Sequence, residues 1–497
     1  MATLERPFPP GTYDVVVVGS GPAGLQTAYC LGRSGIGRHA VISRDEAPGG
    51  MFQRFPVFQR LISWTKPQAP VDPGSREYEW YDHNLLLADK PSHRVLVRDF
   101  MDRSFDVPAR EEMHAALDAF VERAGIAIRY GCALERAWRD GDELVLETTD
   151  GEYRCRAAVF ALGVTEPWLP PLPGIEHARH YVDTGRPSDY DGKRVVIIGK
   201  RNSGFEIAQG LLPWARELAL VSPRPVQTAV LALSALRVRY LQPYDEYVRG
   251  GSGTAVVDAA IERIERRDDG LRVHAQGTTW SGNLELDGDE VIVATGFRTP
   301  LEPLAELGLA TVADGRIPAQ TPFWESVSSP GVFFAGNITQ GSPGMGKHGA
   351  AASSTSVNGF RYNARVLVRH LETRFGIEPV RRGLGRDEAI EFLLDELARA
   401  PELWIQKGYL ARAISADPGD GIRDEGIVPL AHFVDAAGPP AAAVAVEVDA
   451  EGRIVPVVYV RQDGRVDEHL LDPHPLHAFD DAERRAELEA RLRPILG

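Results

Sequence analysis

The sequence predicts an α/β protein with two related units and a smaller C-terminal module of mixed α and β structure. A run of β-branched residues, a glycine-rich turn and a helical pattern follow one another near the N-terminus. The same succession returns about 180 residues later. The last ~120 residues instead alternate in the manner of half-buried strands, between two charged helical patterns.

Length and composition exclude several classes of protein. The 497 residues correspond to about three domains, and 43% hydrophobic with 25% charged residues is typical of a globular chain. That composition excludes a mainly disordered, collagen-like or coiled-coil protein. A net charge of −15 argues against nucleic-acid binding, which needs a basic surface.

Cysteine usage and hydropathy indicate the compartment. Cys30, Cys132 and Cys155 lie far apart and form no Cys-x-x-Cys pair, so neither a disulfide framework, a zinc site nor dithiol chemistry is signalled. No apolar stretch approaches the ~20 residues that a membrane-spanning helix needs. The first eleven residues lack the apolar core of a signal peptide. We therefore expect a cytoplasmic protein with no membrane partner.

The first unit has the order of a dinucleotide-binding βαβ motif. Residues 14–18 are expected to form a buried strand, 25–33 a helix and 40–43 a second strand. Between the first strand and the helix, Gly19 makes the tight turn and Gly21 lets a pyrophosphate approach the backbone. Gly24 lets the helix pack closely on the sheet. The helix N-terminus, with Pro22 and Ala23, offers unpaired N–H groups to an anion.

The end of the second strand departs from the usual pattern. An acidic residue commonly binds the ribose there, but this chain has Ser43, followed by Arg44 and Asp45. Either the ribose contact is altered or Asp45 replaces the usual residue.

The middle of the chain connects this unit to the second one. Residues 111–125 are expected to form a helix, and 143–160 two strands joined by a turn at Asp150-Gly151. A proline-rich stretch at 167–173 is predicted to be a linker.

The second unit repeats the pattern with a less typical turn. Strands are predicted at 193–198 and 218–222, with a helix through Leu212. Gly199 and Gly204 occupy the first and third glycine positions, but Arg201 occupies the second, ahead of Asn202 and Ser203. The Arg201 side chain either obstructs a pyrophosphate or bonds to it, or the nucleotide site is degraded. Ser222 and Arg224 favour NADPH over NADH, unless Arg224 is only a solvated loop residue.

The remaining strands and helices complete the pattern. Strands at 290–295 and 331–335 end in Gly296 and in Gly336-Asn337, and a helix is expected at about 358–371. The C-terminal module is predicted to hold these elements: helices 387–398 and 480–492, and strands 427–434, 441–448, 454–460 and 466–471 in a meander.

Together these motifs resemble the flavoproteins that bind two dinucleotides, over roughly residues 12–372. Gly19–Gly24 is similar to their FAD turn, Pro171–Ile175 to the entry of an inserted NADPH domain, and Gly192–Gly204 to its nucleotide turn. Ala161-Leu162-Gly163 and Ala294–Phe297 (with Thr295 and Gly296) are similar to the two "ATG" strand ends. The resemblance implies an FAD-binding Rossmann-like domain (1–175 and 300–378), an inserted NAD(P)H-binding domain (176–299) and a C-terminal module of unassigned role (379–497).

Within that group the chain looks most like the class B flavin monooxygenases. The stretches 50–66, 108–113 and 358–363 resemble segments of those proteins, whereas their F-x-G-x-x-x-H hallmark is absent. Only His180 stands near the place of its histidine, and Asn337 replaces a usual Asp. The resemblance implies that NADPH reduces FAD and that a C4a-hydroperoxyflavin formed with O₂ oxygenates an amine, a thiol or a ketone of a small molecule. Candidate catalytic residues at the oxygen-reacting edge are Thr65 and Lys66, each with a purely structural alternative.

The expected cofactor contacts extend beyond the glycine turns. For FAD they include these residues: Arg44, Asp45, Gly50, Met51, Phe52, Ser63, Trp64, Gly163, Gly336, Asn337 and His348. Phe52 and Trp64 either stack near the flavin or fill core, and His180 is either a hinge contact or an ordinary junction residue.

Two other functions fit the sequence. One is an NAD(P)H-dependent flavoprotein reductase that passes electrons to an acceptor other than a dithiol. The other is a flavoprotein whose nicotinamide site is degraded, supported by Arg201 and Ser43. The C-terminal module caps the substrate entrance, forms a homodimer interface or only pads the fold, and its sequence does not choose between these.

Overall fold

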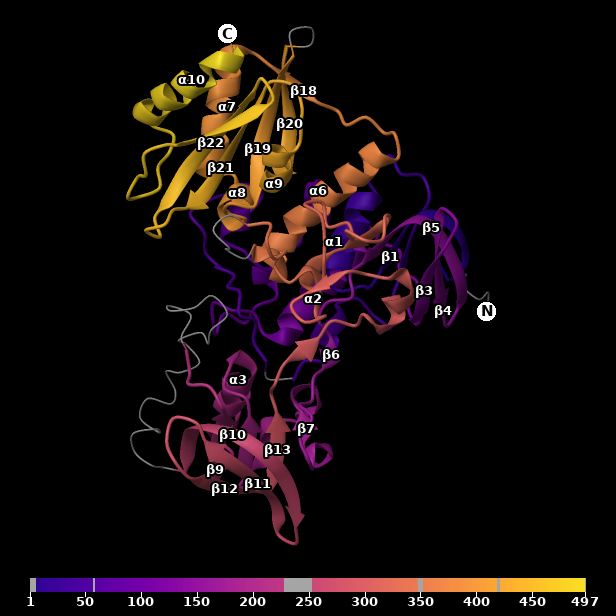
Figure 1. Cartoon of the computed structure of the whole chain (residues 1–497), viewed down its shortest axis with the longest axis vertical. Coiled ribbons are helices and arrows are strands. Elements are labelled where there is room, and N and C mark those ends of the chain that lie inside the picture. Colours follow the sequence, from indigo (N-terminus) through magenta and orange to yellow (C-terminus); the bar gives the residue numbers. More distant parts are fainter. Residues whose placement is uncertain (1–5, 57–58, 228–252, 347–351, 418–420, 497) are drawn as a thin grey trace.

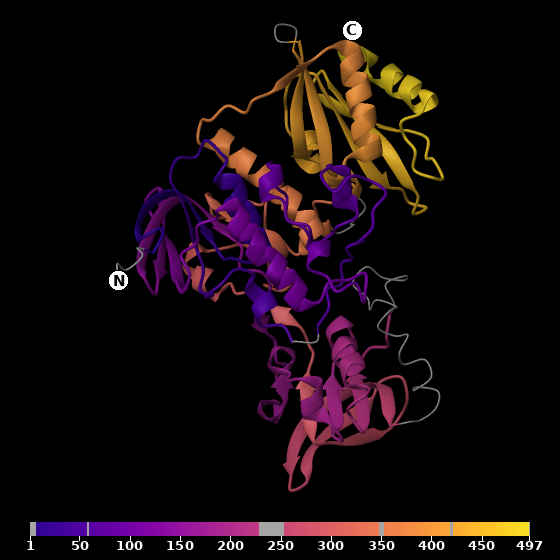
Figure 2. The same cartoon turned by 180° about the vertical axis from the view of Figure 1, so that it is seen from behind.

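The computed structural model describes residues 6–56, 59–227, 253–346, 352–417 and 421–496. Figures 1 and 2 show three bodies along the long axis of the molecule. A central sheet lies between a second sheet at one end and the C-terminal module at the other. The α/β prediction is confirmed.

The central sheet is built on the first predicted unit. Its strands in spatial order are β2 (His39–Ile42), β1 (Gly11–Val18), β5 (Gly151–Phe160), β4 (Glu143–Thr148) and β3 (Leu134–Asp140), and β17 (Val332–Phe334) also pairs with β5. Strand β1 runs parallel to β2 and β5, and β17 runs parallel to β5. The carboxyl ends of these four strands therefore meet at one edge, which is where open α/β sheets bind ligands.

Three helices cover one face of the central sheet. They are α1 (Pro22–Leu31), α2 (Arg110–Ala124) and α6 (Val357–Arg374). Val15 and Val17 of β1 point into this core and Val16 and Val18 into the opposite one, so the strand is buried on both faces. This explains its continuous β-branched sequence.

The second sheet holds the second glycine turn. Its strands in spatial order are β12 (Asn283–Gly288), β11 (Gly270–Gly277), β10 (Thr254–Arg267), β9 (Glu217–Ser222), β8 (Arg194–Ile198), β13 (Glu290–Val293) and β7 (Arg179–His180). Helix α3 (Asn202–Leu211) follows β8. The two sheets are joined through a short pair, β6 (Glu166–Pro167) with β14 (Phe297–Arg298). A second short pair is β15 (Thr311–Val312) with β16 (Ile317–Pro318).

The C-terminal module is a six-stranded antiparallel sheet with helices on its faces. Its strands in spatial order are β18 (Arg382–Leu384), β20 (Gly421–Pro429), β19 (Leu410–Asp417), β21 (Ala441–Val448), β22 (Ile454–Gln462) and β23 (Arg465–Leu470). Its helices are α7 (Arg386–Arg399), α8 (Pro401–Ile405), α9 (Leu430–Asp435) and α10 (Ala482–Leu496). Helices α7 and α10 pack on one face, and α9 contributes to the core on the other.

One predicted strand of the module was wrong. Residues 427–434 do not form a single strand, because β20 ends at Pro429 and α9 begins directly after it. Proline lacks the N–H that a central ladder needs, and Leu430 and Phe433, three residues apart, bury one face of the new helix. The sheet is also not a simple meander, since β19 lies between β20 and β21.

Short 3₁₀ helices mark the loops of the chain. They are η1 (Gly50–Gln53), η2 (Glu77–Trp80), η3 (Pro91–His93), η4 (Val97–Asp99), η5 (Ile175–His177), η6 (Tyr181–Asp183), η7 (Pro187–Tyr190), η9 (Glu302–Leu307), η10 (Gly336–Thr339) and η12 (Ser353–Thr355). No helix among the described residues combines the length and the apolar character that crossing a membrane requires.

Candidate functional site

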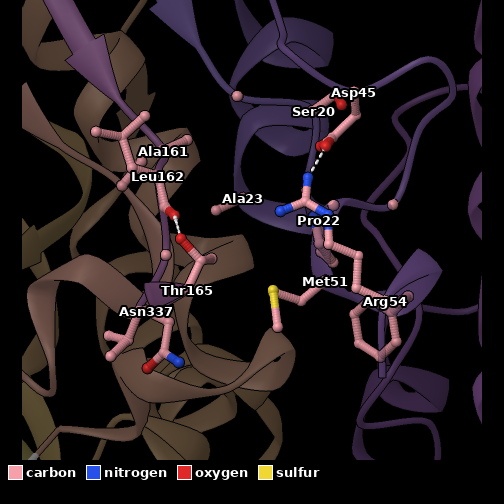
Figure 3. A pocket seen from close by; sticks show the side chains of 18 of the residues that line it. Ser20, Pro22, Ala23, Asp45, Met51, Arg54, Ala161, Leu162, Thr165 and Asn337 are labelled. Atoms are coloured by element: carbon pink, nitrogen blue, oxygen red, sulfur yellow. Dashed lines mark hydrogen bonds and ion pairs between the residues drawn. The ribbon is translucent and has the colours of Figure 1, made fainter. Parts of the chain in front are cut away.

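A cavity of about 390 Å³ opens at the carboxyl edge of the central sheet. Its walls come from the turn after β1, the end of β2, η1, the segment 59–63, the end of β5 and the start of α6. Figure 3 shows Pro22, Ser20 and Arg54 on one side of it and Leu162, Thr165 and Asn337 on the other. Twelve of the residues predicted to bind FAD line it: Gly19, Gly21, Pro22, Ala23, Arg44, Asp45, Gly50, Met51, Phe52, Ser63, Gly163 and Asn337.

The glycine turn after β1 has the shape that a pyrophosphate needs. Gly19 has a φ of +116°, and a Cβ on Gly24 would overlap the carbonyl oxygen of Gly19, so both positions require glycine. A Cβ on Gly21 would meet no protein atom within 4 Å. Gly21 is also the N-cap of α1, and no side chain caps the helix there. The cavity therefore begins at free helix N–H groups beside an open backbone, which fits a dinucleotide phosphate.

The residues that replace the usual ribose-binding acid form a small network. The hydroxyls of Ser43 and Ser20 lie 2.8 Å apart, and the Asp45 N–H donates to Ser43 Oγ at 3.2 Å. The Asp45 carboxylate faces the cavity and forms an ion pair with Arg54 (Figure 3). The carboxylate thus lies in the cavity wall two residues after the expected position, with a cation already beside it.

The opposite wall comes from the ends of β5 and β17. Gly163 has a φ of +66°, and Thr165 Oγ1 donates to the carbonyl of Leu162 at 3.3 Å. Gly336 lies behind the wall rather than in it, since a Cβ there would overlap the Cβ of Ala23. Asn337 is exposed and lines the cavity.

The two candidate catalytic residues do not line the cavity. Thr65 is fully buried, and its hydroxyl donates to Asp82 Oδ1 at 2.7 Å. Lys66 is exposed, with Nζ 5.6 Å from the centroid of the Tyr81 ring. Neither residue is part of the cavity wall, and their assignment to the oxygen-reacting edge stays a prediction beside the structural alternatives. Trp64 also lies outside the wall and contacts His83, with 4.4 Å between the ring centroids and the ring planes tilted by 41°.

Asn84 takes a place at the cavity that sequence reasoning missed. It is buried and lines the cavity, and its Nδ2 donates to Ser63 O at 2.9 Å and to Thr65 Oγ1 at 3.0 Å. Nothing in its local sequence distinguishes it from a loop asparagine. Through this bond Thr65 contacts a residue of the cavity wall without lining the cavity itself.

The second glycine turn is intact in shape. Gly199 has a φ of +129°, and a Cβ on Gly204 would overlap the Gly199 carbonyl oxygen. Arg201 is the N-cap of α3 and is exposed, and no carboxylate of a described residue pairs with it. Lys200 is buried instead: its Nζ donates to Val257 O at 2.8 Å and pairs with Asp258.

The other predicted NADPH contacts lie around this turn. Asn202 and Ser203 begin α3, and Arg224 is exposed just after β9. Thr295 Oγ1 donates to Trp168 O at 2.6 Å, and the Gly296 carbonyl accepts from His180 Nε2 at 3.1 Å. His180 is therefore a buried contact at the junction of the two sheets, and burial lowers its pKa. His348 lies outside the described residues.

Three comparisons relate the chain to known proteins. A family model described as pyridine nucleotide-disulphide oxidoreductase matches residues 16–336, which include both glycine turns. FAD-dependent oxidoreductase domain-containing protein 2 of Danio rerio is 26% identical over 420 residues, covering 73% of this chain and 59% of that protein. The mouse protein of that name is 33% identical over 225 residues, 43% and 32% of the two chains. The chain thus spans less than two thirds of the length of these relatives.

Other relatives have different activities in their names. Ferredoxin–NADP reductase of Salinispora tropica is 29% identical over 71% of this chain and 94% of that one. Bacillithiol disulfide reductase of Bacillus cereus has a TM-score of 0.57 with 20% identity, over 73% of this chain and 100% of that one. A flavin-containing monooxygenase of Stenotrophomonas maltophilia has a TM-score of 0.54 with 23% identity, over 73% and 99%. At these identities the two structures establish the fold only.

Proposed function

Because the chain belongs to the pyridine nucleotide-disulphide oxidoreductase family, we propose that it is a flavin-dependent monooxygenase. FAD and NADPH are its cofactors. The proposed substrates are O₂ and a small molecule with an amine, a thiol or a ketone to be oxygenated. When bound, FAD accepts a hydride from NADPH and delivers the reducing equivalents to O₂.

The chain's own residues divide the task of holding FAD. The N–H groups at the start of α1 donate to the pyrophosphate, and the open backbone at Gly21 lets it come close. Asp45, whose carboxylate also pairs with Arg54, would accept hydrogen bonds from the ribose hydroxyls. Apolar side chains along the walls, such as Leu61 and Leu162, exclude water from the redox centre.

One observation favours oxygenation over disulfide reduction. The three cysteines, all within the described residues, are free thiols, and only Cys132 reaches the cavity wall. Its Sγ donates to Thr148 Oγ1 at 3.3 Å, and burial raises its pKa. A protein that transfers electrons to a disulfide through its own dithiol needs two such thiols. The free thiols therefore support O₂, or an acceptor without a dithiol, as the proposed outlet for electrons.

The alternative proposal is a reductase with a protein or quinone acceptor. It is supported by the ferredoxin–NADP reductase among the relatives. A third proposal, a flavoprotein that NADPH no longer reduces, has Arg201 as its support.

An anaerobic titration with NADPH, followed by air, separates these proposals. Loss of the flavin band shows that the nicotinamide site works. Air is then admitted with panels of small amines, thiols and ketones. Oxygenated product formed in proportion to NADPH consumed supports the monooxygenase. Fast reduction of ferredoxin or a quinone without oxygenated product supports the reductase, and a flavin that neither NADPH nor NADH bleaches rules out both.

The role of Arg201 follows from its exposure at the N-cap of α3. We expect its guanidinium to bond to the NADPH phosphates, so Arg201→Ala raises the KM for NADPH about tenfold with little change in kcat. Arg216→Ala, an exposed arginine of the same domain, serves as the control. A lower KM in Arg201→Ala would show that the side chain obstructs the cofactor.

A further inference from the structure

A polar and aromatic cluster lies directly beside the cavity and is not used by the cofactor proposal. The Trp64 ring contacts the His83 ring at a tilt of 41°, and the His83 backbone N–H donates to the Trp64 carbonyl at 3.2 Å. Asn358 Nδ2 reaches His83 Nδ1 at 3.4 Å. The cluster touches the cavity wall at three neighbours: Ser63 precedes Trp64, Asn84 follows His83, and Ser356 Oγ bonds to Asn358.

The C-terminal module adds a cation to this cluster. Lys407 follows α8, and its Nζ donates to Trp404 O and lies 5.6 Å from the centroid of the Trp404 ring. The Trp404 ring contacts Trp80, 5.0 Å between centroids, three residues before His83. Lys407 is close enough to His83 that its charge, after burial and the charge of Arg361, lowers the pKa of that histidine.

Lys407 has no acidic partner among the residues that the structure describes. The buried carboxylates of α7, α8 and η2 are engaged elsewhere: Glu396 and Glu402 bind Arg76, and Glu79 accepts from the Tyr362 hydroxyl. The half-buried ammonium thus has a single backbone carbonyl as its hydrogen-bond partner, and burial lowers its pKa. A buried cation without a counter-charge is costly, and an anionic ligand would remove that cost.

The backbone on both sides of Lys407 is held firmly. Gln406 Nε2 donates to Asn363 Oδ1 at 2.7 Å and to Ser354 Oγ at 3.3 Å. The Tyr409 hydroxyl donates to Ser342 Oγ at 2.8 Å. These buried bonds join the module to η12 and to the loop after η10, so the position of the ammonium relative to the cavity is set by the fold.

We propose that Trp64, His83, Asn358 and Lys407 form a substrate site beside the flavin cavity for an aromatic carboxylate that also carries the amine, thiol or ketone to be oxygenated. Lys407 pairs with the carboxylate, and the half-exposed Trp64 supplies a flat surface for the ring. Neutral His83 and Asn358 offer hydrogen bonds without adding charge. This inference rests on the proposed function, because it names the substrate class of that same reaction.

The test measures binding to the FAD-loaded protein without NADPH, so that it does not depend on turnover. Phenylacetate and its neutral analogue phenylacetamide are titrated while the flavin spectrum and tryptophan fluorescence are followed. We expect phenylacetate to bind at least tenfold more tightly than phenylacetamide. Lys407→Met should remove this preference by weakening phenylacetate binding about tenfold, with phenylacetamide unchanged.

Two variants control for charge and folding. Lys90→Met removes an exposed lysine of the chain's first domain and should keep the preference for phenylacetate. Lys407→Arg retains the positive charge and should keep most of the preference for phenylacetate, even if Lys407→Met lowers stability. Equal binding of the two probes by the wild type, or a preference that survives in Lys407→Met, would overturn the inference. An unreduced flavin in the NADPH titration would instead reject the proposed function alone.

Discussion

At the scale of single residues, two glycines of the first turn have different physical tasks. Gly24 lets α1 pack on the turn, since a Cβ there would overlap the Gly19 carbonyl, whereas Gly21 faces open space with an ordinary φ of −70°. Gly24→Ala is expected to lower the free energy of unfolding by about 1–3 kcal/mol. Gly21→Ala should leave it nearly unchanged and weaken FAD binding about tenfold or more. Urea unfolding of the apoprotein and titration with FAD check both variants. Equal destabilisation by Gly24→Ala and Gly21→Ala would contradict the separate roles of the two glycines.

His83 makes stability depend on pH. Burial, then the charges of Arg361 and Lys407, lower its pKa to about 4, whereas the unfolded chain titrates near 6.5. As pH falls the unfolded state binds the proton first, so the contribution of neutral His83 is complete above pH 6.5. It is lost between pH 6.5 and about 4, by up to about 3 kcal/mol. His83→Gln should therefore show a smaller loss of stability than the wild type between pH 7 and 4.5 in urea unfolding, and parallel curves would refute it.

At the scale of elements, the residues after helix α8 link the module to the loop that follows η10. The Tyr409 hydroxyl accepts from Trp324 Nε1 at 2.7 Å and donates to Ser342 Oγ, and both partners are buried. Tyr409→Phe leaves the Trp324 N–H without an acceptor, at a cost of about 1–3 kcal/mol. We expect a corresponding loss in urea unfolding and weaker FAD retention. Tyr13→Phe removes a hydroxyl whose one partner among residues 6–56 and the other described ranges is Pro9 O, and it should cost less. The reverse order would show that the Tyr409 contact is not important.

At the scale of the whole molecule, one arginine connects the central body to the C-terminal module. Arg76 donates to Glu396 at 2.6 Å and to Glu402 at 2.7 Å, and both carboxylates are nearly buried. Arg76→Met leaves Glu402 without its partner, so we expect the module to loosen at a cost of roughly 1–3 kcal/mol. Calorimetry should then show a separate early transition. Adding Glu402→Gln should recover part of the loss, and a single unchanged transition in Arg76→Met would contradict this role.

The fold was predictable where local patterns decide the structure. The β-branched run of β1, the glycine turns and the period of α6 each depend on residues close in sequence, and each formed near its predicted place. The change from strand to helix at Pro429 was missed, because the apolar residues that follow it suit either structure.

The candidate site likewise has a part that the sequence predicted and a part that only the tertiary structure set. The residues themselves determined the two glycine turns, the carboxyl-edge cavity that they imply and the lack of a paired dithiol, since these depend on composition and short spacing. Only the tertiary structure decided that Thr65 turns to Asp82, that Asn84 reaches the cavity, and that Lys407 lies near His83. Those contacts join segments up to about 320 residues apart. No local pattern encodes them, because the packing of the module on the central sheet brings their side chains together.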